Sequence, residues 1–137
     1  METSPPFSMT VKTFKTVIMK FHYEDLRIVP IIHQCIQGIY RISQSFPREE
    51  GYGLTSQIRR AATSILLNLA EGSARKSPKE YARFLNISIG SLVEVDACLK
   101  IAKSLSYLEG CDDILVLDRM TEKIYFSLVA IRKSVSL

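Results

Sequence analysis

The sequence is poor in the residues that hold metals. Its 137 residues include only two histidines and three cysteines. Tryptophan, which is not a metal ligand, is absent altogether. His22 and His33 lack the spacing of zinc ligands, and the cysteines form no Cys-x-x-Cys pair. A Glu-x-x-His pair, as in di-iron bundles, would need an acid where the chain has Pro30. The sequence therefore predicts no metal site and no cofactor, and it favours packing of His33 at the edge of the core.

The motifs of common enzymes are also missing. The chain contains no glycine-rich dinucleotide loop, no Walker A motif and no Gly-x-Ser-x-Gly nucleophile elbow. We therefore expect no catalytic residues, and we expect that the protein is not an enzyme.

Glycine and proline are scarce, at six and five residues, and no run of about 18 uncharged apolar residues occurs. These features exclude collagen-like and low-complexity chains and predict no membrane-spanning segment. The composition is 47% hydrophobic and 23% charged, which excludes intrinsic disorder. The odd set of three cysteines, together with the lack of a secretory signal, favours reduced thiols in the cytoplasm.

Apolar periodicity predicts an all-α protein, because no segment alternates with the period of a strand. Residues 1–20 carry a proline pair and no sustained period, so we expect a weakly ordered N-terminal appendage there. Residues 21–137 are expected to form one domain. Short connections between its helices favour an antiparallel up-down-up-down four-helix bundle. The helices are predicted at about 24–46, 54–71, 78–106 and 112–134.

Local signals mark several helix boundaries. Pro30 should kink the first helix or delay its regular start. Gly72 is expected to end the second helix in the left-handed conformation. The string Ser77-Pro78-Lys79-Glu80 predicts a capping box at the start of the third helix. Gly90 lies inside that helix, where glycine is costly, and this predicts a close approach of a neighbouring helix.

The last helix has more apolar residues than one bundle core requires. Twelve of the eighteen residues from Ile114 to Ile131 are apolar or aromatic, and the second helix shows a similar excess. Apolar surface that remains exposed usually marks an interface, so we expect a homo-oligomer. The alternative is that these two helices are simply the most central.

The net charge is +4, from 18 basic and 14 acidic residues, and its excess is concentrated in one stretch. The stretch from Gln57 to Arg83 contains six basic residues and only two acidic residues. We interpret the six as nucleic-acid-binding residues that contact the phosphate backbone of RNA or DNA, although ordinary surface charge is the alternative. Few aromatic residues are interleaved, so binding should depend on salt rather than on base stacking. The six are Arg59, Arg60, Arg75, Lys76, Lys79 and Arg83.

Glu71, within this stretch, and Glu94, beyond it, are interpreted as structural acids. Glu71 lies in the last turn of the second helix, where an acid opposes the helix dipole, so we expect it to pair with Arg75 or Arg83. Glu94 is expected to pair with Arg60 across two antiparallel helices.

Several strings between about Phe21 and Leu108 resemble one known family in their order and spacing. This family comprises four-helix-bundle proteins encoded in the intervening sequences of bacterial 23S ribosomal RNA genes. The last helix shares no such string with the family and resembles it only in its general apolar and helical pattern. The strings are Glu24-Asp25-Leu26, Tyr52-Gly53-Leu54-Thr55-Ser56-Gln57-Ile58-Arg59-Arg60-Ala61-Ala62, Asn68-Leu69-Ala70-Glu71-Gly72, Arg83-Phe84-Leu85 and Gly90-Ser91-Leu92-Val93-Glu94.

The resemblance implies a homopentameric ring. It also implies kinship with the accessory variability determinant protein of diversity-generating retroelements, a basic bundle that binds nucleic acid and a reverse transcriptase. It transfers no catalytic residue, and among its matching positions Asn68 joins Glu71 and Glu94 as a structural polar residue. The chain has Val29-Pro30 where the family usually has Trp-Gln, and Leu66-Leu67 where it commonly has Pro-Ser.

The function that these observations favour is a non-enzymatic oligomer that contacts RNA or DNA through a basic surface. The alternative is a protein-binding scaffold or assembly factor with no role in nucleic-acid binding. Neither reading involves a membrane.

Overall fold

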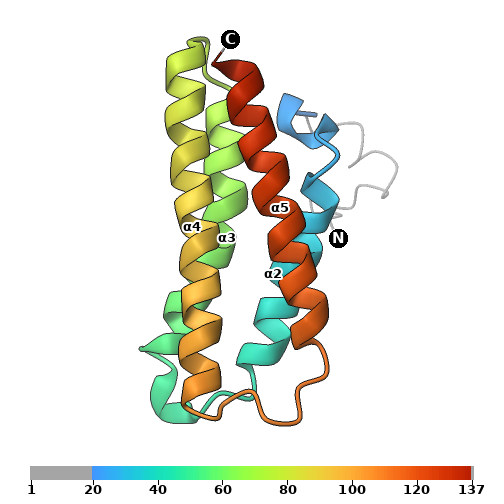
Figure 1. Ribbon diagram of the computed structural model, residues 1–137. Helices are drawn as coiled ribbons and strands as arrows, with labels where there is room; N and C mark the ends of the chain where they lie inside the picture. Colours follow the sequence, from blue (N-terminus) through green and yellow to red (C-terminus); the bar gives the residue numbers. More distant parts are fainter. Residues whose placement is uncertain (1–19, 137) are drawn as a thin grey trace, which may run out of the picture.

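The structure, a computed structural model, describes residues 20–136. These residues form four long helices and two short 3-10 helices, with no strand among them (Figure 1). The predicted all-α four-helix bundle is therefore confirmed. Apart from Lys20, the appendage expected over residues 1–20 lies outside the described residues. The elements are η1 (His22–Asp25), α2 (Val29–Ser43), η2 (Arg48–Glu50), α3 (Leu54–Ser73), α4 (Pro78–Ser104) and α5 (Ile114–Val135).

Helices that follow one another in sequence pack side by side, and α5 closes the bundle against α2. The most extensive contact joins α3 and α4. Because the chain reverses direction at each connection, the α3–α4 connection and the C-terminal end of α5 lie at one end of the bundle (Figure 1). The α2–α3 and α4–α5 connections lie at the other end.

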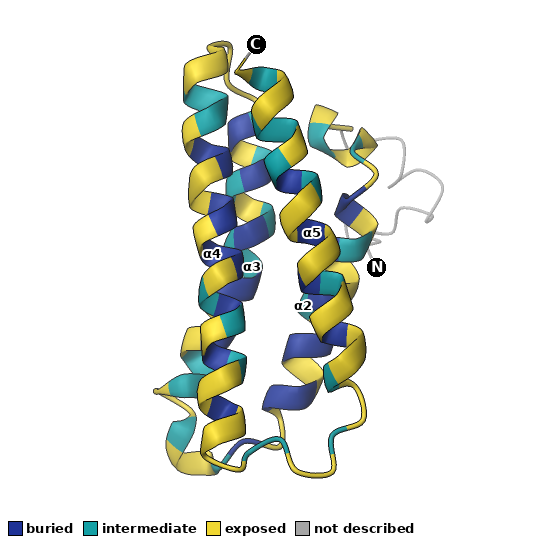
Figure 2. Cartoon of the chain, viewed as in Figure 1, coloured by how far each residue is buried: buried dark blue, intermediate teal, exposed yellow. Residues whose placement is uncertain are grey.

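The periodic apolar residues from which the helices were predicted lie on the inner faces of the helices and form the core (Figure 2). A few of their outer members are half-buried, among them Leu54, Leu99 and Ile114. The largest side chains that are fully buried are Ile32, Ile39, Ile58, Ile65, Leu69, Leu85, Leu117, Ile124 and Leu128.

The first long helix is shorter than the predicted range 24–46. It begins at Val29 because Pro30 has no amide to donate and fits the first helical turn. Before it, the amide of Phe21 donates to the Glu24 carboxylate at 2.7 Å, within the separate turn η1. After Ser43 the chain continues in tight turns up to Pro47. The other three helices begin and end within two residues of the predicted bounds.

Two glycines have roles that differ from those predicted. Gly72 lies inside α3 and is buried, so it does not end the helix in the left-handed conformation. A Cβ atom at Gly72 would lie 2.6 Å from the Cβ of Phe84 on α4. A Cβ atom at Gly90 would meet nothing within 4 Å, and the predicted close approach there is wrong. The close α3–α4 contact therefore depends on Gly72.

The apolar excess of α5 forms a second, exposed face. Leu115, Val116 and Phe126 are 70%, 51% and 62% exposed, and Leu67 on α3 is 65% exposed. The bundle does not cover these side chains with its own helices. None of the helices within residues 20–136 is long and apolar enough to span a membrane.

Candidate functional site

The α3–α4 hairpin brings four of the predicted basic residues to one end of the bundle. Arg75 and Lys76 lie on the connection after α3, whereas Lys79 and Arg83 lie in the first two turns of α4. All four side chains are exposed.

Arg59 and Arg60 lie elsewhere, near the start of α3. At 1.5 Å per residue, they are about 20 Å along the helix from Arg75, so the six basic residues do not form one group. Arg59 Nε donates to Ser43 Oγ at 2.8 Å, and its guanidinium lies 4.7 Å from the centre of the Tyr40 ring. Arg59 therefore joins α3 to α2.

Two further cations lie at the end of the bundle that holds Arg75. Arg132 and Lys133 occupy the last turn of α5, which runs beside the first turns of α4. Arg132 Nη1 donates to Asn86 Oδ1 on α4 at 2.8 Å. The antiparallel topology predicts the α4–α5 contact, but these two cations are about 50 residues beyond the basic stretch in the sequence, so charge along a single stretch does not indicate them. We call the following six residues the basic end: Arg75, Lys76, Lys79, Arg83, Arg132 and Lys133.

Phe84 organises the two arginines of the hairpin. Its ring is buried against Gly72, whose lack of a side chain lets α4 approach α3. The guanidinium carbons of Arg75 and Arg83 lie 5.0 and 4.6 Å from the ring centre. Contacts of this kind attract a cation to an aromatic face. One aromatic side chain thus holds two cations at the same place.

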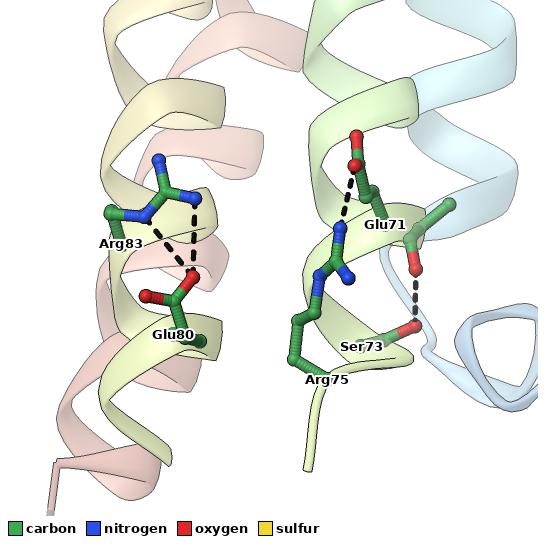
Figure 3. A network of polar contacts seen from close by, with 6 residues as sticks. Glu71, Ser73, Arg75, Glu80 and Arg83 are labelled. Carbon is green, nitrogen blue, oxygen red and sulfur yellow. Dashed lines mark hydrogen bonds and ion pairs between the residues drawn. The ribbon is translucent and has the colours of Figure 1, made fainter. Parts of the chain in front are cut away.

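Each of these arginines also pairs with an acid on its own part of the chain (Figure 3). Arg75 contacts Glu71 at 2.8 Å, which confirms one of the predicted pairs, and Arg83 contacts Glu80 at 3.1 Å. Exposed ion pairs contribute little to stability and are screened by salt, so they orient the arginines without removing the local positive charge. Lys76 and Lys79 take part in no ion pair within residues 20–136.

The start of α4 contributes one backbone amide, that of Lys79, which has no hydrogen-bond partner among the described residues, because Pro78 has no N–H and the Tyr81 amide donates to the Ser77 carbonyl at 3.0 Å. Ser77 Oγ accepts a hydrogen bond from the Glu80 amide at 3.4 Å, which is one half of the predicted capping box. The other half is wrong, because the Ser77 amide does not donate to the Glu80 carboxylate. The Glu80 carboxylate is turned to Arg83. Lys79, in the first turn, opposes the helix dipole and does not help the helix to form. An anion near the start of α4 would be stabilised both by the helix dipole and by the Lys79 side chain.

The predicted polar residues lie along the α3–α4 seam. Glu94 accepts from Gln57 Nε2 at 2.6 Å, while Arg60 donates to Gln57 Oε1 at 3.3 Å. The predicted direct pair of Glu94 with Arg60 is wrong because Gln57 lies between them. Asn68 Nδ2 donates to the carbonyl and hydroxyl oxygens of Ser64, both at 2.8 Å.

Two of the three cysteines, Cys35 and Cys98, are buried. Burial raises the pKa of the Cys35 thiol to about 11, and burial and nearby Glu94 raise that of Cys98, so both thiols are poor nucleophiles. His33 is exposed rather than packed at the core edge, and that expectation is wrong. No three metal-ligating side chains within residues 20–136 lie close enough together to hold a metal ion.

Comparison with protein families gives one match. The sequence model of the 23S rRNA-intervening sequence protein matches residues 24–128, which are 105 of the 137 residues. The chain belongs to this family. Its description names where these proteins are encoded and no chemical activity. The match contains the hairpin cations of this intervening-sequence protein, while Arg132 and Lys133 lie beyond it. No curated protein matches the chain.

Proposed function

We propose that this intervening-sequence protein acts in the cytoplasm as a homo-oligomer that binds the phosphate backbone of RNA or DNA through its basic end. The protein in this proposal is a binding protein rather than an enzyme. The observation that carries the proposal is the convergence of six basic side chains, against two acids, where α3, α4 and α5 meet.

The chemistry of this end suits a polyanion better than a single small anion. The cations extend over the α3–α4 connection and the helices α4 and α5, and Lys76 and Lys79 have no ion pair among the described residues. Arginine forks held against Phe84 can make two hydrogen bonds to one phosphate. A groove of about 610 Å³ between the start of α4 and the end of α5 includes Lys79, Arg83 and Asn86. A phosphate backbone could follow this groove.

Association of several copies would strengthen such binding. The resemblance implies a pentameric ring, and the exposed apolar face of α5 is consistent with association. A ring whose axis runs parallel to the bundles would place every basic end on the same side, so that one long strand could contact several copies at once.

The test is the affinity for a 20-base-pair DNA duplex and for an RNA strand across a salt series. We expect the logarithm of the association constant to fall linearly with the logarithm of salt concentration. Replacing both Lys76 and Lys79 by glutamine should weaken binding and reduce the duplex slope by about 1.8, since each lost phosphate contact changes it by about 0.9. The matched control is Arg48→Gln with Lys103→Gln, two exposed cations at the other end of the bundle.

A flat salt response, or equal effects of the two double variants, contradicts the proposal. That result favours the second candidate function, a protein-binding scaffold, for which the exposed apolar side chains Leu115, Val116 and Phe126 provide a docking surface.

A further inference from the structure

Helix α5 carries charges of opposite sign on its two flanks. The flank that faces α4 presents Asp118 and Glu122, which line a groove of about 480 Å³ between these helices. A third carboxylate, Asp96, joins them from α4, where it pairs with Lys100 at 2.7 Å. The exposed apolar side chains Val93 and Phe126 lie in the same groove.

The opposite flank of α5 faces α2 and is basic. Arg119 and Lys123 line a groove of about 270 Å³, together with Val116 and Met120. Helix α2 contains no acidic residue to compensate them. This groove is therefore both cationic and apolar.

The four charges in the first half of α5 have no ion-pair partner among residues 20–136. Asp118, Arg119, Glu122 and Lys123 are all exposed and appear in none of the ion pairs of this part of the chain. Each flank combines two charges of one sign with exposed apolar surface, although Lys100 and Lys103 of α4 line the groove next to Asp118. The two flanks are thus opposite in charge, and both also expose apolar side chains that a partner could cover.

The heights of the charges also agree. Asp118 and Arg119 are neighbours in sequence, as are Glu122 and Lys123, so each acid lies within about 1.5 Å of a cation along the helix axis. Rotation about an axis parallel to α5 preserves height. Such a rotation brings the acidic flank of one copy level with the basic flank of the next.

We propose that a second copy of this chain docks its α2–α5 flank into the α4–α5 groove. Resting on the oligomer of the proposed function, this inference names the two surfaces that meet. Arg119 and Lys123 of one copy then lie opposite Asp118 and Glu122 of its neighbour. Every copy offers one flank and receives the other, so that the contact repeats around the axis.

Charge reversal on each flank tests this contact by sedimentation velocity at 50 µM. The wild-type protein should sediment as an oligomer of the 15.5 kDa chain. Asp118→Lys with Glu122→Lys gives two basic flanks, and Arg119→Glu with Lys123→Glu gives two acidic flanks. Each double variant alone should sediment as a monomer, whereas their equimolar mixture should associate. The control, Glu49→Lys with Glu109→Lys, reverses two exposed acids on the α2–α3 and α4–α5 connections, outside both grooves, and should leave assembly unchanged.

A chain with all four substitutions exchanges the flanks at constant net charge and should associate like the wild type. It guards against variants that fail to fold, which circular dichroism would also show. A monomeric wild type, reversals that leave assembly intact, or a mixture that stays monomeric overturns the inference. Reversals that leave assembly intact while Lys76 and Lys79 still control salt-dependent binding would reject this interface and retain the proposed function. If the charge reversals dissociate the oligomer as expected, but replacement of Lys76 and Lys79 does not affect binding, the interface is retained and the proposed function is rejected.

Discussion

Gly72 shows how one missing side chain sets the geometry of the basic end. It lets α4 approach α3, and this approach buries the Phe84 ring that holds Arg75 and Arg83. The two arginines therefore depend on a residue that contacts neither the solvent nor a ligand.

Gly72→Ala should destabilise the protein. The new methyl group would lie 2.6 Å from the Phe84 Cβ. This Cβ is attached directly to the backbone of α4, so it can move only if α4 moves. Overpacking of this kind costs roughly 1–3 kcal/mol, which equals or exceeds the gain of up to about 1 kcal/mol in helix propensity. Thermal unfolding followed by circular dichroism measures the change in the free energy of unfolding.

Gly90→Ala is the matched control for that variant. It adds the same methyl group to an exposed position with nothing within 4 Å, so it should stabilise α4 by about 1 kcal/mol. If both variants shift the melting temperature in the same direction, the role assigned to Gly72 is wrong.

The sequence does not distinguish these glycines, because both lie inside helical patterns and only the partner helix decides their roles. The same limit applies to the predicted pair of Glu94 with Arg60. Its level along the seam was predicted correctly, but Gln57 occupies the space between. Glu71 and Arg75 were predictable because they are four residues apart on one chain segment.

At the scale of the element, apolar periodicity predicted each helix and its inner face. The ends were less predictable where the backbone changes from α-helical to 3-10 turns, as it does around α2. Pro30 and Pro47 are consistent with the two changes from α-helical to 3-10 backbone. Their positions alone do not predict the residue at which regular α-helical hydrogen bonding begins or ends.

The cap of α4 is the clearest local signal, and its contribution can be measured. Ser77→Ala removes the hydroxyl that accepts from the Glu80 amide, so it should lower the free energy of unfolding by about 1 kcal/mol. Thermal or urea unfolding gives this value. Ser104→Ala, in the last turn of the same helix, removes a hydroxyl bonded only to the Ile101 carbonyl and should have little effect. Equal losses in the two variants would show that Ser77 does not act as a cap.

At the scale of the whole molecule, the basic end could be predicted only in part. The hairpin cations are close in sequence, but Arg132 and Lys133 join them through the antiparallel packing of α5 on α4. Arg59 and Arg60 show the converse, since a stretch of sequence that runs along a 20-residue helix separates its charges in space.

Repetition of the basic end in an oligomer predicts a dependence on nucleic-acid length. A single-stranded DNA of 60 nucleotides should bind at least about tenfold more tightly per site than one of 10 nucleotides, because the long strand can reach several copies. Fluorescence anisotropy at fixed salt measures both affinities. The variant Asp118→Lys with Glu122→Lys, expected to be monomeric, should lose this difference. Equal affinities per site for the wild type would argue against a shared binding face.

The opposite signs on the two sides of α5 impose a parity rule on mixed assemblies. In a closed circle built from the two reversed variants, the kinds must alternate, and only an even number of members can alternate around a circle. A pentamer of the natural chain therefore has no counterpart in the mixture, which must form tetramers, hexamers or open chains. A natural ring with an even count could keep its mass in the mixture, whereas one with an odd count could not, so a comparison of the two masses tests whether the natural count is odd.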